Sequence, residues 1–281
     1  MNTEEIKSYI KKINDEQFKN VSSIISVSKM LDFLARKFDA EKQALICEEK
    51  GKTDSKYKYA GMTAAEIMEQ WSSKAAESMK YGRLLDTYAG LSFKDTSLTE
   101  SLEVWKLDNN FDYDDRLKNN CTGFDEFVAD MTAYGYEYVG REMTVYLRTE
   151  NGNVVTGRLD CLFRNPSNGR FLIVDWKTTD DIKLSGFGNQ KFFGPGMDID
   201  DCDMSKYTTQ LHIYKEALCN TYGLGKPDDI SVAVVNLRKE AEANGRHYLL
   251  YKENFQFKSK RLHDFVDFAI KKRALLSTEQ K

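Results

Sequence analysis

An aspartate and a lysine close an otherwise apolar stretch of the chain. The segment FLIVDWKTTD, residues 171–180, runs through four apolar residues into Asp175, Trp176 and Lys177. Such a run is typical of a buried strand, where a charged side chain is costly unless it is used. Asp175 and Lys177 are two residues apart and therefore lie on one face of that strand. The pattern therefore leaves open what use a carboxylate and an ammonium group have at the end of a core strand.

The first of two predicted turns brings further acids to this place. The sequence ENG, residues 150–152, fits a three-residue hairpin loop with Gly152 in the left-handed conformation. Met143 then lies across from Leu159, so that apolar side chains face each other. A two-residue Asn-Gly turn gives worse pairs throughout. In the better register Glu142 lies opposite Asp160.

The second predicted turn connects Asp160 to the apolar strand. The sequence PSNG, residues 166–169, fits a four-residue loop. Leu162 then faces Ile173, and Asp160 falls opposite Asp175. Directly opposed residues in a sheet have Cβ atoms about 5 Å apart, so the two carboxylates would be close neighbours.

Together the two turns place Glu142, Asp160 and Asp175 in one row across three strands. Lys177 lies beside the row, with Arg158 opposite it. Carboxylates this close raise one another's pKa unless a cation lies among them. Oxygen ligands with no His or Cys nearby suit Mg²⁺ or Mn²⁺, which activate water and neutralise charge on a phosphate, while a lysine orients or deprotonates the water or stabilises the phosphate oxygens. The simpler alternative is a salt-bridged pair on a solvated sheet face.

Hydrophobic periodicity predicts the elements that position these residues. In chain order they are helices within 1–60, a helix over 61–90, strands over 141–149, 153–164 and 170–178, a helix over 206–223, strands over 230–239 and 247–257, and a helix over 259–276. A glycine-rich segment at 185–204 is long enough for a lid or a binding loop. This order predicts an α/β or α+β core.

Composition limits the function classes further. The chain has 281 residues, is 41% hydrophobic and carries a formal charge of −3, which argues against a protein that coats polyanions over its whole surface. A local basic groove beside an acidic metal site remains open. Five scattered cysteines without a CxxC pattern are typical of a reducing compartment. No segment resembles a membrane helix or the apolar core of a signal peptide, so the expected location is cytoplasmic, in a bacterial cell or a phage-infected host.

The motif residues resemble the PD-(D/E)XK nuclease superfamily, and within it the RecB-like exonuclease branch. The matching pattern is GRLD at 157–160, followed by IVDWKT at 173–178. A glutamate on the preceding strand is common in that branch and is matched by Glu142. A helix with Gln and Tyr four residues apart follows in the branch, and Gln210 and Tyr214 match it. The resemblance covers about residues 137–222.

The resemblance implies a restriction-endonuclease-like fold, with a mixed central sheet of about five strands flanked by helices. Residues 1–135 are then an N-terminal helical region that packs on the core and contributes one site helix, and 136–281 form the nuclease core. Asp160, Asp175 and the Trp176 carbonyl are implied metal ligands. Glu142 is implied as a ligand directly or through water, and Lys177 as the group that positions the nucleophile.

The branch often has a metal-binding histidine four residues after a glycine on an N-terminal helix. Here Gly82 is followed by Asp86, which can serve a hard metal equally well or can be an ordinary exposed helix residue. Some relatives also carry an iron–sulfur cluster that needs clustered C-terminal cysteines. No cysteine follows Cys219, so we expect no such cluster.

Several residues are predicted to contact DNA. Gln210 and Tyr214 lie one helical turn apart on one face, although Tyr214 can also be a core residue. The glycine-rich segment offers cations for phosphates and aromatic rings for stacking on bases. A mobile, solvated loop is the alternative there. The predicted contacts are Gln210, Tyr214, Arg158, Lys183 and Lys191, with Phe192 and Phe193 as stacking residues.

The expected function is thus a Mg²⁺- or Mn²⁺-dependent deoxyribonuclease, an exonuclease in DNA recombination, repair or phage DNA processing. A structure-specific or nicking endonuclease uses the same chemistry. An inactive fold that binds nucleic acid as an assembly subunit is the alternative from another class. A protein partner or homo-oligomer is a further expectation, whereas a nucleotide-binding loop such as GxxxxGKS does not occur.

Overall fold

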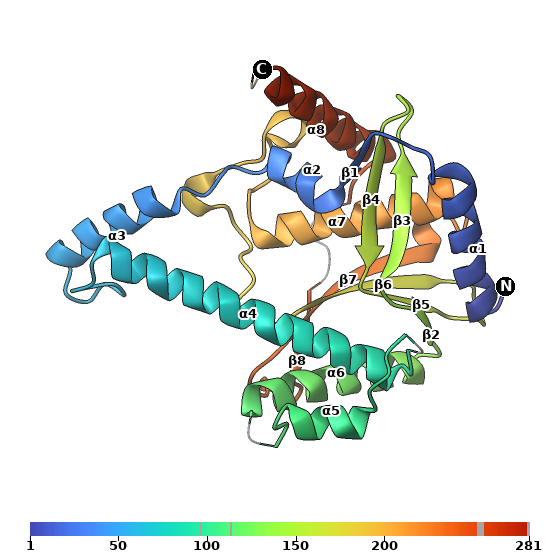
Figure 1. Cartoon of the computed structure of the whole chain (residues 1–281), viewed down its shortest axis with the longest axis horizontal. Coiled ribbons are helices and arrows are strands. Elements are labelled where there is room, and N and C mark those ends of the chain that lie inside the picture. Colours follow the sequence, from blue (N-terminus) through green and yellow to red (C-terminus); the bar gives the residue numbers. More distant parts are fainter. Residues whose placement is uncertain (96, 113, 252–255, 280–281) are drawn as a thin grey trace.

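Two β-sheets meet at Asp160, and helices cover their faces (Figure 1). The computed structural model describes residues 1–95, 97–112, 114–251 and 256–279. Over these residues the fold is mixed, with eight α-helices and two mixed sheets, which confirms the predicted α+β class. The helices are α1 (Thr3–Gln17), α2 (Val27–Leu34), α3 (Ala40–Thr53), α4 (Ala64–Ser92), α5 (Leu102–Asp108), α6 (Asp115–Ala133), α7 (Asp203–Glu216) and α8 (Ser259–Glu279).

The smaller sheet has the strand order β1-β4-β3 and the larger sheet the order β2-β5-β6-β7-β8. The smaller sheet consists of β1 (Ile24–Ser26), β3 (Met143–Arg148) and β4 (Val154–Leu159). The larger sheet consists of β2 (Glu137–Gly140), β5 (Cys161–Arg164), β6 (Phe171–Lys177), β7 (Ile230–Leu237) and β8 (Tyr248–Tyr251). Only β6 and β7 run parallel in the larger sheet, and β1 and β4 run parallel in the smaller one.

The registers predicted from the two turns are confirmed within each sheet. Met143 pairs with Leu159, and Gly152 adopts the left-handed conformation with φ at 78°. Leu162 pairs with Ile173 in the ladder between β5 and β6. Turn chemistry and apolar pairing therefore set both registers locally.

The predicted single meander is wrong, because the strand expected over 153–164 breaks at Asp160 and continues in the other sheet. The main-chain N–H of Trp176 donates to Asp160 Oδ2 at 3.0 Å, so the carboxylate takes a hydrogen bond that a neighbouring strand would otherwise receive. Arg158 consequently lies opposite Thr144 of β3 and not opposite Lys177, which pairs with Asn236 of β7.

The strand β6 is buried on both faces, as its apolar run indicates. Phe171 and Ile173 belong to the core that α7, α2 and α8 cover, and Leu172 and Val174 belong to the core under α4 and α6. By the same alternation Asp175 lies on the α7 side of the sheet.

Helix α4 extends from a distal arm to the sheet. It begins with the predicted capping box of Thr63 and Glu66. Its first turns pack on α3 around a small cluster with buried Ala44 and Ile67, and its last turns pack on α6 (Figure 1). The helix predicted over 61–90 is thus confirmed, and it carries Asp86 towards the ends of the strands.

Three other predicted elements have clear outcomes. The helix predicted over 206–223 forms as α7 over Asp203–Glu216 and continues as a π-helical turn over Ala217–Thr221, after which Gly223 has φ at 62°. Strand β1 was not predicted within 1–60, since two adjacent isoleucines are too short a pattern to distinguish from a helix. Of the strand predicted over 247–257, Tyr248–Tyr251 forms, and 252–255 lies outside the described residues.

Candidate active site

The carboxylate of Asp175 is buried, with only 2% of the residue exposed, and is held from two sides. Lys177 Nζ lies 2.6 Å from Asp175 Oδ2. Gln210 Nε2, from α7, donates to Asp175 Oδ1 at 3.2 Å. The ring of Tyr207, one turn earlier in α7, lies 4.6 Å from Lys177 Nζ in a cation–π contact. Strand β6 and helix α7 therefore fix the acid and the amine together.

Asp160 lies in the link between β4 and β5, beside Asp175. Burial and then the negative charge of Asp175 raise the pKa of Asp160 from its usual value of 3.8 to about 8, against the opposing effects of Lys177 and the Trp176 N–H. A carboxyl group in this state holds a proton near neutral pH unless another cation replaces it. Asp160 and Asp175 are therefore both ionised near neutral pH only if a further cation joins them.

Lys177 is a cation in this arrangement. Burial lowers the pKa of Lys177, but the carboxylates of Asp175 and Asp160 outweigh that effect and raise it above its ordinary value. A lysine in this state donates hydrogen bonds and neutralises charge, and it is a poor proton acceptor.

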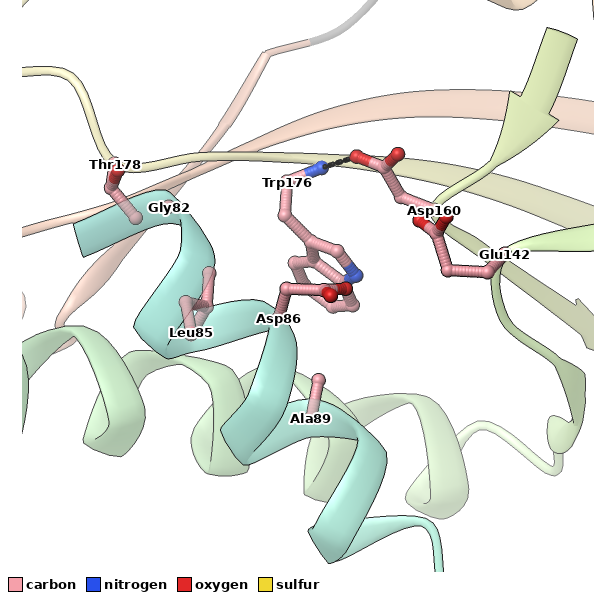
Figure 2. Close-up of a pocket in the computed structure, with 8 residues that line it drawn as sticks. All are labelled: Gly82, Leu85, Asp86, Ala89, Glu142, Asp160, Trp176 and Thr178. Carbon is pink, nitrogen blue, oxygen red and sulfur yellow. Dashed lines mark hydrogen bonds between the residues drawn. The ribbon is translucent and has the colours of Figure 1, made fainter. Parts of the chain in front are cut away.

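A cavity of about 200 Å³ opens beside Asp160. Its lining residues come from α4, from the segment between β2 and β3, and from the ends of β4 and β6, and Figure 2 shows them around one space. They are Gly82, Leu85, Asp86, Ala89, Glu142, Asp160, Trp176 and Thr178. The cavity therefore unites three predicted site acids, Asp86, Glu142 and Asp160, from three elements.

Glu142 reaches this cavity through an unusual backbone conformation. It precedes β3 and has φ at 52°, in the left-handed region that residues other than glycine rarely adopt. Its pKa is raised, first by burial and also by the charge of Asp86, although Arg158 and Arg141 oppose this. Arg158 Nη1 lies 2.7 Å from Glu142 Oε2, so Arg158 neutralises this acid within the protein.

Asp86 lies in the cavity lining, and its carboxylate pairs with the guanidinium of Arg141. The same guanidinium lies 3.0 Å from Asp95. Arg141 has a side chain only 9% exposed and therefore ties α4 to the segment that carries Glu142. The role of Asp86 as a metal ligand stays a prediction, and it would have to compete with this ion pair.

The donor set fits a hard divalent cation with few protein ligands. Among the described residues, no three His, Cys, Asp or Glu side chains converge tightly enough to hold a metal by themselves. Asp160 and Asp175 provide two carboxyl groups, and the negative charge of Asp175 helps to raise the pKa of Asp160. Mg²⁺ is commonly bound by one or two carboxylates together with waters and substrate phosphates, so these two acids and the Trp176 carbonyl are its expected ligands.

The residues predicted to contact DNA differ in their burial and in their partners. Tyr214 is buried against Gly157 of β4, where an added Cβ would lie 2.3 Å from the tyrosine ring, so its packing role is evident. Lys183 pairs with Asp181, and Lys191 pairs with Asp200 at 2.6 Å. Their contact with DNA stays a prediction.

The stacking role proposed for Phe192 is wrong. Only 1% of Phe192 is exposed, and it belongs to the core under α8. Phe193 is the ring that faces outward in the same segment, where Arg36 and Lys272 lie over it. The strand-like alternation of neighbouring side chains separates the two rings.

Two residues near the site were missed by reasoning from the sequence. Arg141 had no local signal, because its partners Asp86 and Asp95 are about fifty residues away in the chain. For Tyr207 the sequence did contain a signal, because Tyr207 lies three residues before Gln210 and therefore on the same helix face.

The chain matches no model of a known protein family, and it matches no curated protein. Within the described ranges, none of the helices combines the length and apolar character needed to cross a membrane. The resemblance to nucleases therefore rests on the motif residues themselves.

Proposed function

We propose that this protein is a Mg²⁺- or Mn²⁺-dependent deoxyribonuclease that hydrolyses phosphodiester bonds beside Asp160 and Asp175. One observation carries the proposal. Asp160 lines a cavity, buried Asp175 raises the pKa of Asp160 by its negative charge, and Lys177 on the same strand face as Asp175 pairs with it. An ordinary structural ion pair needs one acid per base, so the second acid is unexplained unless a cation joins it.

A divalent cation bound here would supply a water of lowered pKa and would neutralise charge on the phosphate. Asp160 and Asp175 would hold it, and Gln210 keeps the Asp175 carboxylate in position. Lys177 remains charged and can donate hydrogen bonds to phosphate oxygens or to the attacking water. Tyr207 restricts the lysine side chain to this place.

We infer that the substrate is DNA with a free end, as in an exonuclease, because the motifs resemble the RecB-like exonuclease branch. The direction of digestion along the DNA and the need for a free end depend on the path that the DNA strand takes outside the active site. An endonuclease of the same chemistry would cut circular DNA as well.

Digestion of end-labelled linear and circular DNA, single- and double-stranded, tests the proposal with Mg²⁺, Mn²⁺ or EDTA. We expect metal-dependent loss of linear DNA only, and none in EDTA. Cleavage of circles would identify an endonuclease. No cleavage in either metal, with DNA binding retained, would contradict catalysis and favour a nucleic-acid-binding subunit.

A further inference from the structure

A basic groove lies outside the active site, and its lining residues come mainly from α2, from α8 and from the segments that precede α3 and α7. Figure 1 shows where these elements lie. It consists of two adjoining cavities of about 890 and 450 Å³, which share Arg36, Lys37, Phe38, Phe193 and Lys206. Six cations and a single acid, Asp32, line the larger cavity. The cations are Lys29, Arg36, Lys37, Lys206, Lys272 and Arg273. The chain as a whole has a net charge of −3, so this concentration of cations is local.

The acids near the basic groove already have partners. Asp32 lies 3.6 Å from Lys29, and Asp201 lies 3.1 Å from Lys206. Asp39 accepts a hydrogen bond from the main chain at the start of α3. Four cations therefore form no ion pair with a carboxylate anywhere in the described part of the chain. They are Arg36, Lys37, Lys272 and Arg273.

Two of these four cations are fixed in place by neutral groups. Lys272 Nζ donates to the Phe33 carbonyl at 3.0 Å, and Arg273 donates to the Ile24 carbonyl at 3.1 Å. These bonds hold the side chains without neutralising them. Positive charge that is ordered and unneutralised indicates a site for an anion.

Aromatic rings alternate with the cations. Phe193 lies between the Arg36 guanidinium at 4.7 Å and the Lys272 ammonium at 4.6 Å. Phe38 and Phe187, on facing segments, are 68% and 73% exposed. Large exposed rings among phosphate-binding cations are the arrangement that single-stranded nucleic acids use, since their unpaired bases stack on such rings.

The wall of the basic groove is a packed part of the fold. The main-chain N–H of Phe193 donates to the Leu34 carbonyl at 2.7 Å, which joins the glycine-rich segment to α2. Gly194 has φ at 59°, and an added Cβ there would lie 2.6 Å from the Phe268 ring of α8. The groove is therefore preformed and needs little ordering to bind a ligand.

The basic groove and the Asp175–Lys177 pair both contact helix α7. Lys206 lines the groove, and the next residue, Tyr207, contacts the Lys177 ammonium. A strand lying in the groove thus reaches the helix that carries Gln210.

We propose that the basic groove binds single-stranded DNA and guides it to the active site. The choice of DNA rests on the proposed nuclease function, whereas the preference for a single strand comes from the exposed rings. Cations would bind the phosphates, and Phe38 would stack on an unpaired base. Double-stranded DNA offers the same phosphates but no free base faces.

Fluorescence anisotropy with a labelled oligo-dT strand and a matched duplex, in EDTA, tests this without any cleavage. For Arg36→Glu/Lys37→Glu we expect binding of both DNAs to weaken about tenfold or more, with a shallower salt dependence. For Phe38→Ala we expect about fivefold weaker binding of the single strand, with unchanged duplex binding and salt dependence. The matched control is Lys260→Glu/Lys271→Glu, which reverses two exposed charges of α8 outside the groove.

Three results would overturn the proposal. The first is an equal loss of binding in the control variant and the groove variant, because that would mean diffuse electrostatic attraction. Unchanged single-strand binding in Phe38→Ala removes the stacking role. The third is a parent protein that does not bind oligo-dT but binds poly-glutamate, which would identify the groove as a site for an acidic protein. Groove-dependent binding by a parent that cleaves no DNA would leave this proposal standing and refute only the nuclease.

Discussion

Asp160→Asn is expected to abolish DNA cleavage and, at the same time, to stabilise the metal-free protein at alkaline pH. Cleavage should fall by at least about a thousandfold, as expected when a group required in the transition state is removed. Stability should rise because Asn is neutral and ends the repulsion with Asp175. Opposite effects on activity and stability are typical of a residue kept for function.

The stability of the metal-free protein is expected to decrease as the pH rises. The folded-state pKa of Asp160, about 8, is above its usual value of 3.8, so the folded protein binds this proton more tightly than the unfolded chain does. The corresponding stability is present at acid pH and is lost as the pH rises to about 8. In EDTA at about pH 9, we therefore expect Asp160→Asn to be more stable than the parent by about 2 kcal/mol.

Thermal unfolding in EDTA at acid and alkaline pH measures this effect. Asp264→Asn is the control for loss of a carboxylate, because Asp264 is exposed on α8 and far from the cavity lining. It should change neither stability nor cleavage appreciably. An Asp160→Asn variant that still cleaves DNA, or that is no more stable than the parent at alkaline pH, is inconsistent with the proposed site.

Lys177→Met is expected to destabilise the protein by about 3–5 kcal/mol and to abolish cleavage. Asp175 is only 2% exposed and would lose the ammonium group 2.6 Å away, leaving a buried carboxylate without a cation. Lys177→Arg retains a cation and should preserve most of the stability, although the larger guanidinium does not reproduce the position of the amine.

A double-mutant cycle separates the ion pair from packing losses. Asp175→Asn combined with Lys177→Met removes both charges, so its destabilisation in urea should be smaller than the sum of the single effects by about 2 kcal/mol or more. Additive single effects would show that the two side chains are not coupled. All of these variants except Lys177→Arg should lack detectable cleavage.

The strand registers around the site were predictable because their causes are local. The left-handed Gly152 and the apolar pairing of Met143 with Leu159 fix one hairpin, and the pairing of Leu162 with Ile173 fixes the next. The acids Glu142 and Asp160 follow from these registers, and the structure places both in one cavity.

The break at Asp160 was not predictable, because it depends on a side chain that accepts the Trp176 N–H. Alternation along 153–164 continues through the break, so the pattern gives no sign that the strand changes sheets. The predicted position of Arg158 opposite Lys177 failed for this reason.

The sequence indicated only part of the basic groove, because Phe193 was expected to stack on a base but its cationic neighbours were not brought together by any pattern. Arg36, Phe193 and Lys272 are far apart in the chain and meet only because a main-chain bond joins the glycine-rich segment to α2. The overall acidic charge of the chain conceals this local concentration of cations. Tertiary packing alone creates the charged surface.

The most direct test of the central claim, that Asp160 and Asp175 bind a divalent cation, is a calorimetric titration with Mn²⁺. We expect one saturable site per chain, with an affinity that increases as the pH rises towards about 8 and the Asp160 carboxyl loses its proton. Asp160→Asn and Asp175→Asn should lose this site. A parent protein that binds no Mn²⁺, or variants that bind it as the parent does, would contradict the claim.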